Sequence, residues 1–190
     1  MGAARVGCRA ELRVKPVGID PRTERLYVTW ADYRNGDVDV FCATSRDRGR
    51  VWSPAVRVNN DPVHDGADQF FQWLAVDPAD GSADVVFYDR RGDAENRAAV
   101  VVLARSTDGG QTFANYAWTT MPFDPGDEFI GDYTGVAALK GRVYGVWTYG
   151  ETPAVPRPAA SQNRTRAIRI PRRPNTLVQV GMADFQPNAK

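Results

Sequence analysis

One eight-residue pattern, Ser-x-Asp-x-Gly-x-x-aromatic, occurs twice in the chain, as SRDRGRVW at 45–52 and as STDGGQTF at 106–113. A longer repeat surrounds it. Ile19-Asp20-Pro21 is matched by Val76-Asp77-Pro78, and Asp32-x-Arg34 is matched by Asp89-x-Arg91. A third, weaker copy, TGVAALKGRVYGVWTYGE, begins at Thr134. Repeats of roughly 40 to 60 residues are typical of propellers and other arrays of one structural unit.

Each unit consists of short segments rich in Val, Tyr, Phe, Trp and Thr, separated by Gly, Pro, Asp and Asn. This is typical of antiparallel strands joined by turns, and no helix of useful length is expected. The first unit should contain strands at 12–17, 26–31, 39–44 and 55–58. The second should contain strands at 70–76, 84–88, 98–105 and 116–120. The third unit begins with strands at 135–139 and 142–148 and then loses the pattern.

The octets lie where the third strand of a unit turns into the fourth. The carboxylates of Asp47 and Asp108 can accept backbone N–H bonds in a tight turn, and Gly49 and Gly110 can adopt positive φ. We expect the aromatic residue that ends each octet to pack into its sheet. The predicted turn residues are Ser45, Asp47, Gly49 and Trp52 in the first octet, and Ser106, Asp108, Gly110 and Phe113 in the second.

The octet resembles the Asp box, or BNR repeat, of the sialidase superfamily, in which it is a structural marker on the face opposite the active site. The resemblance covers roughly residues 10–150. It implies an all-β fold, a partial β-propeller of four-stranded antiparallel blades, which has six blades in that family. Because propellers usually have 4 to 8 blades, we expect the remaining blades to be missing from this chain. A fragment or module of a longer propeller is favoured over a self-assembling oligomer.

The C-terminal segment, 151–190, departs from the repeat. From Thr152 to Ala183 it has no acidic residue but six arginines and five prolines. Like charge and proline both oppose packing. We therefore expect a poorly ordered tail in which Leu177–Met182 is a stray strand.

The loops opposite the octets carry 13 of the 23 acidic residues. Arg34, Arg90 and Arg91 lie in the same loops, and with Asp32, Asp89 and Asp132 they are candidates for substrate binding. Carboxylates, guanidinium groups and aromatic rings are the groups that sugar or divalent-cation sites use. The alternative is that Asp and Asn serve turn geometry, and that Arg34 and Arg91 pair with their own Asp32 and Asp89 as a repeated structural feature.

Tyr133 is the candidate nucleophile. The sequence GDYTGVAALKGRVYGVWTYGE resembles the segment around the nucleophilic tyrosine of sialidases, with Tyr133-Thr134 in the matching position. A neutral phenol, deprotonated by a neighbouring Glu, is not repelled by a substrate carboxylate. However, Phe70-Phe71-Gln72-Trp73, which matches the strand that carries this Glu in the family, contains no acid.

The resemblance implies an exo-α-sialidase or a related glycoside hydrolase acting on terminal sugars of glycans, which we expect to be inactive as this fragment. The alternative is a non-catalytic propeller that binds glycan or protein, stabilised by calcium on its acidic face. No other cofactor or bound metal is expected. A secreted or cell-surface location is suggested by the resemblance alone.

Composition excludes several other classes. A formal charge of +1 indicates no polyanionic partner, so we expect no nucleic-acid binding, and the longest apolar runs are far too short for a membrane span. Two cysteines, Cys8 and Cys42, define neither a disulfide framework nor a metal site.

Overall fold

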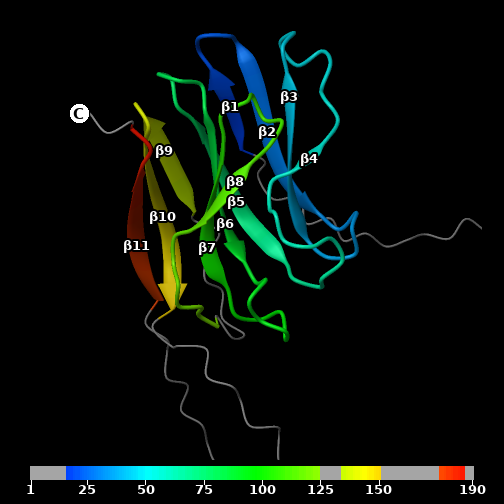
Figure 1. Cartoon of the computed structure of the whole chain (residues 1–190), viewed down its shortest axis with the longest axis vertical. Coiled ribbons are helices and arrows are strands. Elements are labelled where there is room, and N and C mark those ends of the chain that lie inside the picture. The colour runs from blue at the N-terminus through cyan, green and yellow to red at the C-terminus, as the bar shows by residue number, and fades with distance from the viewer. Residues whose placement is uncertain (1–15, 125–133, 151–175, 187–190) are drawn as a thin grey trace, which may run out of the picture.

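The computed structural model of the protein describes residues 16–124, 134–150 and 176–186. In these residues every regular element is a β-strand, and the strands form three antiparallel sheets that follow one another along the chain (Figure 1). The predicted all-β class with four-stranded antiparallel sheets is confirmed, and the described sheets do not close into a ring, which is consistent with part of a propeller. Among the same residues no helix has the length and hydrophobicity that a membrane crossing requires.

The first two sheets have four strands each, in chain order. The first contains β1 (Val17–Asp20), β2 (Arg25–Asp32), β3 (Asp39–Ser45) and β4 (Val56–Arg57). The second contains β5 (Gln69–Val76), β6 (Ala83–Asp89), β7 (Val100–Ser106) and β8 (Ala114–Ala117). Both match the repeat predicted from sequence, and most strand ends lie within one or two residues of the predicted ones.

The first strand is displaced from its predicted position at 12–17, because Val17 pairs with Val28 and Asp20 with Arg25. Asp20, the last residue of this strand, organises the turn that follows: its carboxylate accepts hydrogen bonds from the Arg22 backbone N–H (3.0 Å) and from the Thr23 hydroxyl (2.7 Å).

The third sheet differs most from the expectation. It contains β9 (Gly135–Leu139), β10 (Arg142–Gly150) and β11 (Thr176–Asp184), with β10 in the middle. We expected Leu177–Met182 to be a stray strand, but β11 pairs with all nine residues of β10. The reason is its alternating apolar pattern, which matches that of β10 across the pair. The proposed domain boundary near residue 150 stays a prediction.

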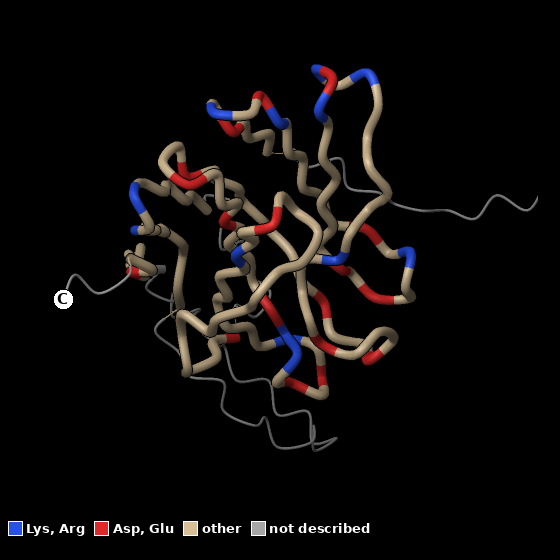
Figure 2. The backbone as a smooth tube through the Cα atoms, turned by 45° about the horizontal axis from the view of Figure 1, so that its top comes forward, with Lys and Arg blue, Asp and Glu red and all other residues tan. Residues whose placement is uncertain are grey.

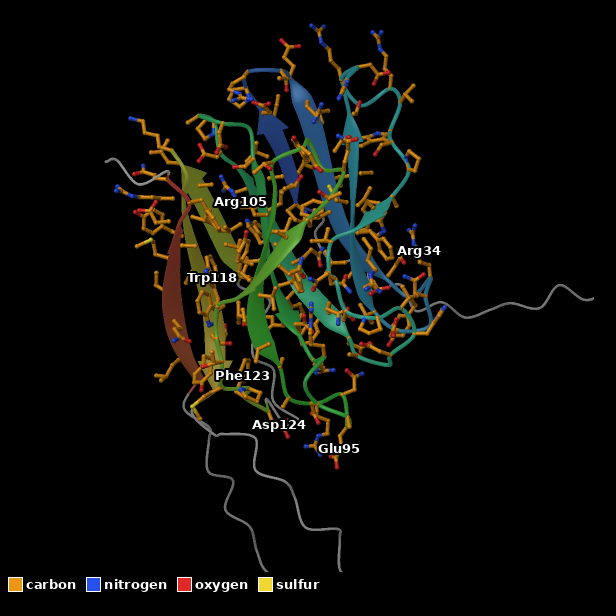
Figure 3. All side chains as sticks on the ribbon, in the orientation of Figure 1. Arg34, Glu95, Arg105, Trp118, Phe123 and Asp124 are labelled. Atoms are coloured by element: carbon orange, nitrogen blue, oxygen red, sulfur yellow. The ribbon has the colours of Figure 1, made fainter. Side chains whose placement is uncertain are left out.

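The core lies between the sheets. One cluster joins the first sheet to the second through Tyr27, Cys42, Leu74 and Phe87. Another joins the second sheet to the third, where Trp118 and Trp147 stack with ring centroids 5.4 Å apart (Figure 3). Every residue of β6, in the middle sheet, is buried. A strand that is apolar on both faces is expected only where a sheet has neighbours on both sides.

Candidate functional site

The octets and the acidic loops lie at opposite ends of the sheets, as the alternation of antiparallel strands requires. The octets join β3 to β4 and β7 to β8, whereas the other end carries the loops 33–38, 58–68 and 90–99 and the segment 118–124. We call this end the loop face. Acidic positions recur along these loops (Figure 2).

Both octets form the same turn. The Ser45 hydroxyl donates to Asp47 (2.8 Å) and accepts from the Gly49 N–H (2.9 Å). In the second octet, Ser106 makes the corresponding bonds to Asp108 (2.7 Å) and Gly110 (2.9 Å). Gly49 and Gly110 have φ of 82° and 86°. Each aspartate also accepts backbone N–H bonds, from Val51 and from Gln111 and Thr112 respectively. These contacts account for the octets as turns.

The aromatic residues of the octets have different environments. Phe113 packs against the core between the first two sheets, as expected. Trp52 does not pack into its sheet: its side chain is 40% exposed, and its indole N–H donates to the carbonyl of Gly49 (3.1 Å). The physical reason is that Phe113 can pack against the first sheet, whereas Trp52 lies in the first sheet and no described sheet packs on that side of it.

The Asp-x-Arg motifs form the same local pair in two sheets. The Arg34 Nε donates to Asp32 Oδ1 (2.9 Å), and the Arg91 Nε donates to Asp89 Oδ2 (2.6 Å). In each motif the arginine backbone N–H also bonds to the aspartate (3.1 and 2.9 Å). This geometry agrees with the structural alternative for these four residues, because both guanidinium groups are engaged within their own loops.

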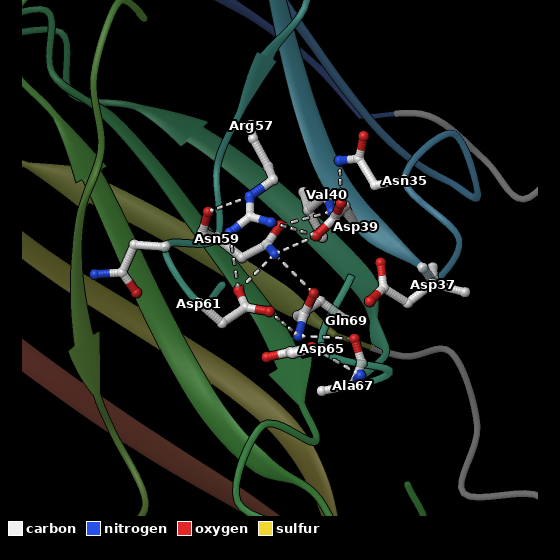
Figure 4. Close-up of polar contacts among 12 residues, drawn as sticks. Asn35, Asp37, Asp39, Val40, Arg57, Asn59, Asp61, Asp65, Ala67 and Gln69 are labelled. Carbon is white, nitrogen blue, oxygen red and sulfur yellow. Dashed lines mark hydrogen bonds and ion pairs between the residues drawn. The ribbon is translucent and has the colours of Figure 1, made fainter. Parts of the chain in front are cut away.

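A buried polar cluster lies beneath the loop face, between the first two sheets (Figure 4). The Asn59 side-chain amide donates to Asp39 (2.6 Å), to Asp61 (2.7 Å) and to the carbonyl oxygen of Gln69 (2.7 Å). Gln69 in turn donates to Asp61 (3.1 Å) and Asp89 (3.3 Å). All five residues are at most 6% exposed.

Arginines supply the positive charge of this cluster. The Arg57 guanidinium lies 3.3 Å from Asp39 and 3.6 Å from Asp61, and that of Arg91 lies 3.7 Å from Asp61. Among the described residues no group of three or more His, Cys, Asp or Glu side chains has the geometry to hold a metal ion. Two guanidinium groups therefore offset part of the charge of the three buried carboxylates.

Unlike Arg34 and Arg91, which hold equivalent positions in the repeat, Arg90 has no arginine counterpart in the first sheet. Its equivalent there is Tyr33. The Arg90 guanidinium stacks on Phe70, with the Cζ atom 4.6 Å from the ring centroid, and lies 3.6 Å from Asp68. Burial lowers the pKa of Arg90, and the charge of Asp68 opposes this shift. The Arg90 Nε atom is buried and has no hydrogen-bond partner among the described residues.

Tyr33 lies on the neighbouring loop and belongs to the same surroundings. The negative charge of Asp68, together with burial, raises the pKa of Tyr33. The tyrosine is 60% exposed. At this point of the loop face, the guanidinium of Arg90 and the phenol of Tyr33, which belong to two different sheets, both interact with the carboxylate of Asp68.

The innermost strand of the second sheet is irregular where it reaches the loop face. The pairing of β5 with β6 shifts register between Phe70 and Trp73, and Phe71 adopts a φ of 54°. Positive φ at a bulky residue costs free energy and is found more often at functional sites than elsewhere. The bulge places Gln72 in a buried position, 8% exposed, at the start of the strand.

Tyr88 forms the floor beside this bulge. Its hydroxyl donates to the carbonyl of Thr148 (2.7 Å) and accepts from the Thr148 N–H (3.0 Å), which ties β6 to β10. Burial raises the pKa of Tyr88 to about 12. This tyrosine is therefore a neutral structural group.

Two predicted site residues, Asp132 and Tyr133, lie outside the described residues, just before Thr134.

The sequence-based analysis missed three features of this region. Asn59 and Gln69 looked like loop residues, and only the contact between two sheets makes them buried hydrogen-bond partners. The bulge at Phe71 had one available signal, an unbroken apolar Phe-Phe pair where alternation was expected. Finally, Tyr33 was not singled out. The comparison of Tyr33 with Arg90 in the repeat could have found it.

A shallow hollow of about 350 Å³ lies at the octet end, not at the loop face, and is lined by Ile19, Glu24, Leu26 and Arg48. It contains one carboxylate and one guanidinium but no buried polar group. We do not regard it as a catalytic site.

No family model matches the chain, and no curated protein matches its sequence. Among solved structures the chain is similar to a Hadza microbial sialidase, Hz136, with 16% identity and a TM-score of 0.49, over 72% of this chain and 32% of that one. It is also similar to an N-acetylgalactosamine deacetylase from F. plautii, solved in complex with blood group B trisaccharide. That match has 17% identity and a TM-score of 0.45, over 90% of this chain and 49% of the other. The chain thus spans less than half the length of each.

Proposed function

We propose that this chain is part of a sialidase-like propeller whose loop face binds a terminal acidic sugar of a glycan. The observation that carries the proposal is the environment of Arg90. This arginine is not part of the repeated Asp-x-Arg pair, it stacks on Phe70 at 4.6 Å, and its Nε atom has no partner among the described residues. The Nε atom itself is buried, but the contact of the guanidinium with Asp68, at 3.6 Å, is too long for a hydrogen bond. The terminal N–H groups of this partly exposed side chain therefore retain donors for a carboxylate.

The surrounding groups suit a sugar acid. Tyr33 offers a hydroxyl and an aromatic face on the other side of Asp68, and sugar sites combine such aromatic surfaces with a few fixed polar groups. Arg34 and Arg91 serve the architecture in this proposal, since each bonds to the aspartate two residues before it. Asp32 and Asp89 then position these arginines and do not bind substrate.

Hydrolysis would use Tyr133 as nucleophile, with Asp132 next to it in the sequence. The chemistry needs a base to take the phenol proton. The stretch Phe70-Phe71-Gln72-Trp73, which matches the strand where the resemblance expects a glutamate, contains no acid, so the base must come from another residue or another part of the propeller. Binding is therefore proposed for this chain, and turnover is proposed for the assembled propeller.

Saturation-transfer NMR with a sialyl-lactose, compared with lactose, tests the binding proposal. We expect the acidic sugar to bind, and Arg90→Gln to weaken binding at least tenfold, because a charged hydrogen bond contributes about 1.5–3 kcal/mol. Arg34→Gln is the matched control, since it removes the same charge from a neighbouring loop. Equal effects of the two substitutions, or no binding of the acidic sugar, would refute the role of Arg90.

A fluorogenic sialoside separates binding from turnover. If the propeller hydrolyses this substrate, Tyr133→Phe is expected to abolish the reaction while leaving sialyl-lactose binding intact. Hydrolysis that survives in Tyr133→Phe would exclude Tyr133 as the nucleophile. Binding without hydrolysis in the parent protein would instead favour a non-catalytic glycan-binding propeller.

A further inference from the structure

The two outermost sheet surfaces are apolar, and each continues an interface that the structure already contains. The first-sheet outer face is the side of β1–β3 that points away from the second sheet; its members are Val17, Ile19, Leu26, Val28, Trp30 and Phe41. The third-sheet outer face is the side of β9–β11 that points away from the second sheet; its members are Leu139, Tyr144, Val146, Val178, Val180 and Met182.

Glycines fix which side of each sheet points inward. A Cβ atom at Gly18 would lie 2.8 Å from Val76, so Gly18 faces the second sheet and its neighbours Val17 and Ile19 face away. A Cβ atom at Gly181 would lie 2.4 Å from Trp147, so Gly181 faces inward and Val180 faces away. Several outward residues are exposed: Val17 by 65%, Ile19 by 53% and Val180 by 70%. Phe41, by contrast, is 4% exposed, because the Arg34 guanidinium lies over its ring.

The middle sheet shows how such surfaces become covered. Leu74 and Val76 hold the positions in the second sheet that Val17 and Ile19 hold in the first. Leu74 is 6% exposed, and Val76 packs against the core beside the first sheet. The face that is open on the first sheet is therefore the same face by which the second sheet receives its predecessor.

The octets repeat this relationship. A Cβ atom at Gly110 would lie 2.8 Å from Thr44 and 3.4 Å from Tyr27, so the second octet rests on the first sheet, and Phe113 beside it is packed against the core. The first octet has no described sheet to rest on, and Trp52 is 40% exposed. The exposed side chain of Trp52 therefore lies where another sheet would pack on the first sheet. By analogy with Phe113, the surface that fits there is the outer face of a sheet equivalent to the third.

We propose that a second copy of this chain covers both faces. The third-sheet outer face of each copy packs on the first-sheet outer face of the other, which repeats the contact already made between successive sheets. Two such contacts, related by a two-fold axis, close a ring of six sheets, within the 4 to 8 that propellers use. A head-to-tail contact forms a closed ring when the rotation between copies permits it. The described residues form two four-stranded sheets and one three-stranded sheet, so two copies together supply six sheets.

We infer that a second copy covers the two outer faces because its contacts would repeat those already made between successive sheets. A second copy uses both open faces at once and leaves no apolar sheet face in water. The outer edge of β11 does not obstruct the ring, because sheets in a propeller contact one another by their faces. The closed ring would also complete the loop face around its axis, so that Arg90 of each copy would share one central site.

Light scattering coupled to size-exclusion chromatography tests the proposal on the full chain over a concentration series. We expect a particle of twice the 21.0 kDa chain mass. A monomer at every concentration, or an open series of larger particles, overturns the closed dimer. This result depends on no substitution.

Two single variants test the head-to-tail geometry. Ile19→Glu and Val180→Glu each place a charge on one of the two faces, and each is expected to convert the dimer to a monomer with an unchanged far-UV circular dichroism spectrum. An equimolar mixture of the two variants is expected to regain particles of twice the chain mass, because one copy retains an intact first-sheet face and the other an intact third-sheet face. Val51→Glu, on an exposed octet residue outside both faces, should leave the dimer unchanged.

The same variants distinguish another dimer. If β11 paired edge to edge with the β11 of a second copy, Val180→Glu would disrupt the dimer, Ile19→Glu would not, and mixing would restore nothing. That pattern refutes the six-sheet ring.

Discussion

The carboxylate of Asp77, in the turn after β5, accepts a 2.6 Å hydrogen bond from the backbone N–H of Gly141, in the turn between β9 and β10. The N–H of Lys140 donates to the same carboxylate at 3.0 Å. One fully buried side chain of the second sheet thus holds the hairpin turn of the third. Burial raises the pKa of Asp77, but the N–H bonds from Gly141, Ala79 and Lys140 outweigh it, so the pKa lies below its usual value.

Asp77→Ala is expected to destabilise the protein by about 1–3 kcal/mol, because it leaves two buried backbone donors without an acceptor. For a chain of this size each kcal/mol lowers Tm by about 2–4 °C. Asp65→Ala is the control, since the exposed Asp65 side chain bonds only to the nearby Ala67 N–H. Equal Tm values for the two variants would show that Asp77 does not join the sheets.

The octet aspartate Asp108 predicts a loss of stability in acid. Burial raises its pKa, but hydrogen bonds from Thr112, Ser106 and Gln111 outweigh this effect and lower it to about 2. An unfolded aspartate titrates near ~3.9. The stabilisation is therefore complete above that pH and is lost as pH falls through about 2. Between neutral pH and pH ~2, the Tm of Asp108→Asn should fall less steeply with pH than that of the wild type. The control variant Glu24→Gln, at an exposed residue, should show the same pH dependence of Tm as the wild type.

The buried ion pair of Arg105 and Asp84 predicts a pH dependence of stability opposite to that of Asp108. Their side chains are 2.9 Å apart, and burial raises the pKa of Asp84 to about 6 (Figure 3 shows Arg105). A raised folded-state pKa favours the folded protein below ~3.9, and this contribution is lost as pH rises through about 6.

Arg105→Met is therefore expected to cost about 3–5 kcal/mol at pH ~8, where an unpaired carboxylate stays buried, and less at pH ~5, where it can bind a proton. Urea unfolding at the two pH values measures the difference. The double variant Asp84→Leu with Arg105→Met should recover most of the lost stability. An equal cost at both pH values would contradict the assigned role of Asp84.

Cys42 should be chemically inert in the folded protein. It is completely buried, and burial raises the pKa of its thiol to about 12. Because the thiolate is the reactive form, a chromogenic disulfide reagent should modify Cys42 in a Cys8→Ser chain only after denaturation. Rapid modification under native conditions would mean that the contact between the first two sheets opens readily.

Calcium is expected to leave the thermal midpoint unchanged. The buried carboxylates of Asp39 and Asp61 already lie within 3.3–3.6 Å of the Arg57 guanidinium, which offsets part of their charge and repels a further cation there. Melts with added calcium and with chelator should coincide, since a ligand that binds only the folded state would raise Tm. A midpoint that rises with calcium would support the calcium-stabilised alternative.

Much of the fold follows from local sequence. The 57-residue spacing of Asp32 and Asp89 and the aromatic and β-branched residues of β2 and β6 placed the strands of two sheets, because these patterns depend on neighbours in the same strand. The octet turns were predictable for the same reason: Ser45, Asp47 and Gly49 bond to one another within five residues.

Contacts between sheets were much harder to predict. Trp52 and Phe113 hold the same place in their octets, yet only Phe113 has a sheet against it. Likewise Gln69 is buried through Asn59, ten residues away, and through Asp89, twenty residues away. Leu177–Met182 was predicted as a strand, but its pairing with β10 was not, because an arginine- and proline-rich stretch separates the two and hides the repeat.

Because β6 is shielded from water on both faces, its amide protons can exchange with solvent only after one of the flanking sheets has detached. Exchange should therefore begin at β1 and β11, proceed inward, and reach β6 last. The order in which the sheets lose protection would report the strength of each contact between them.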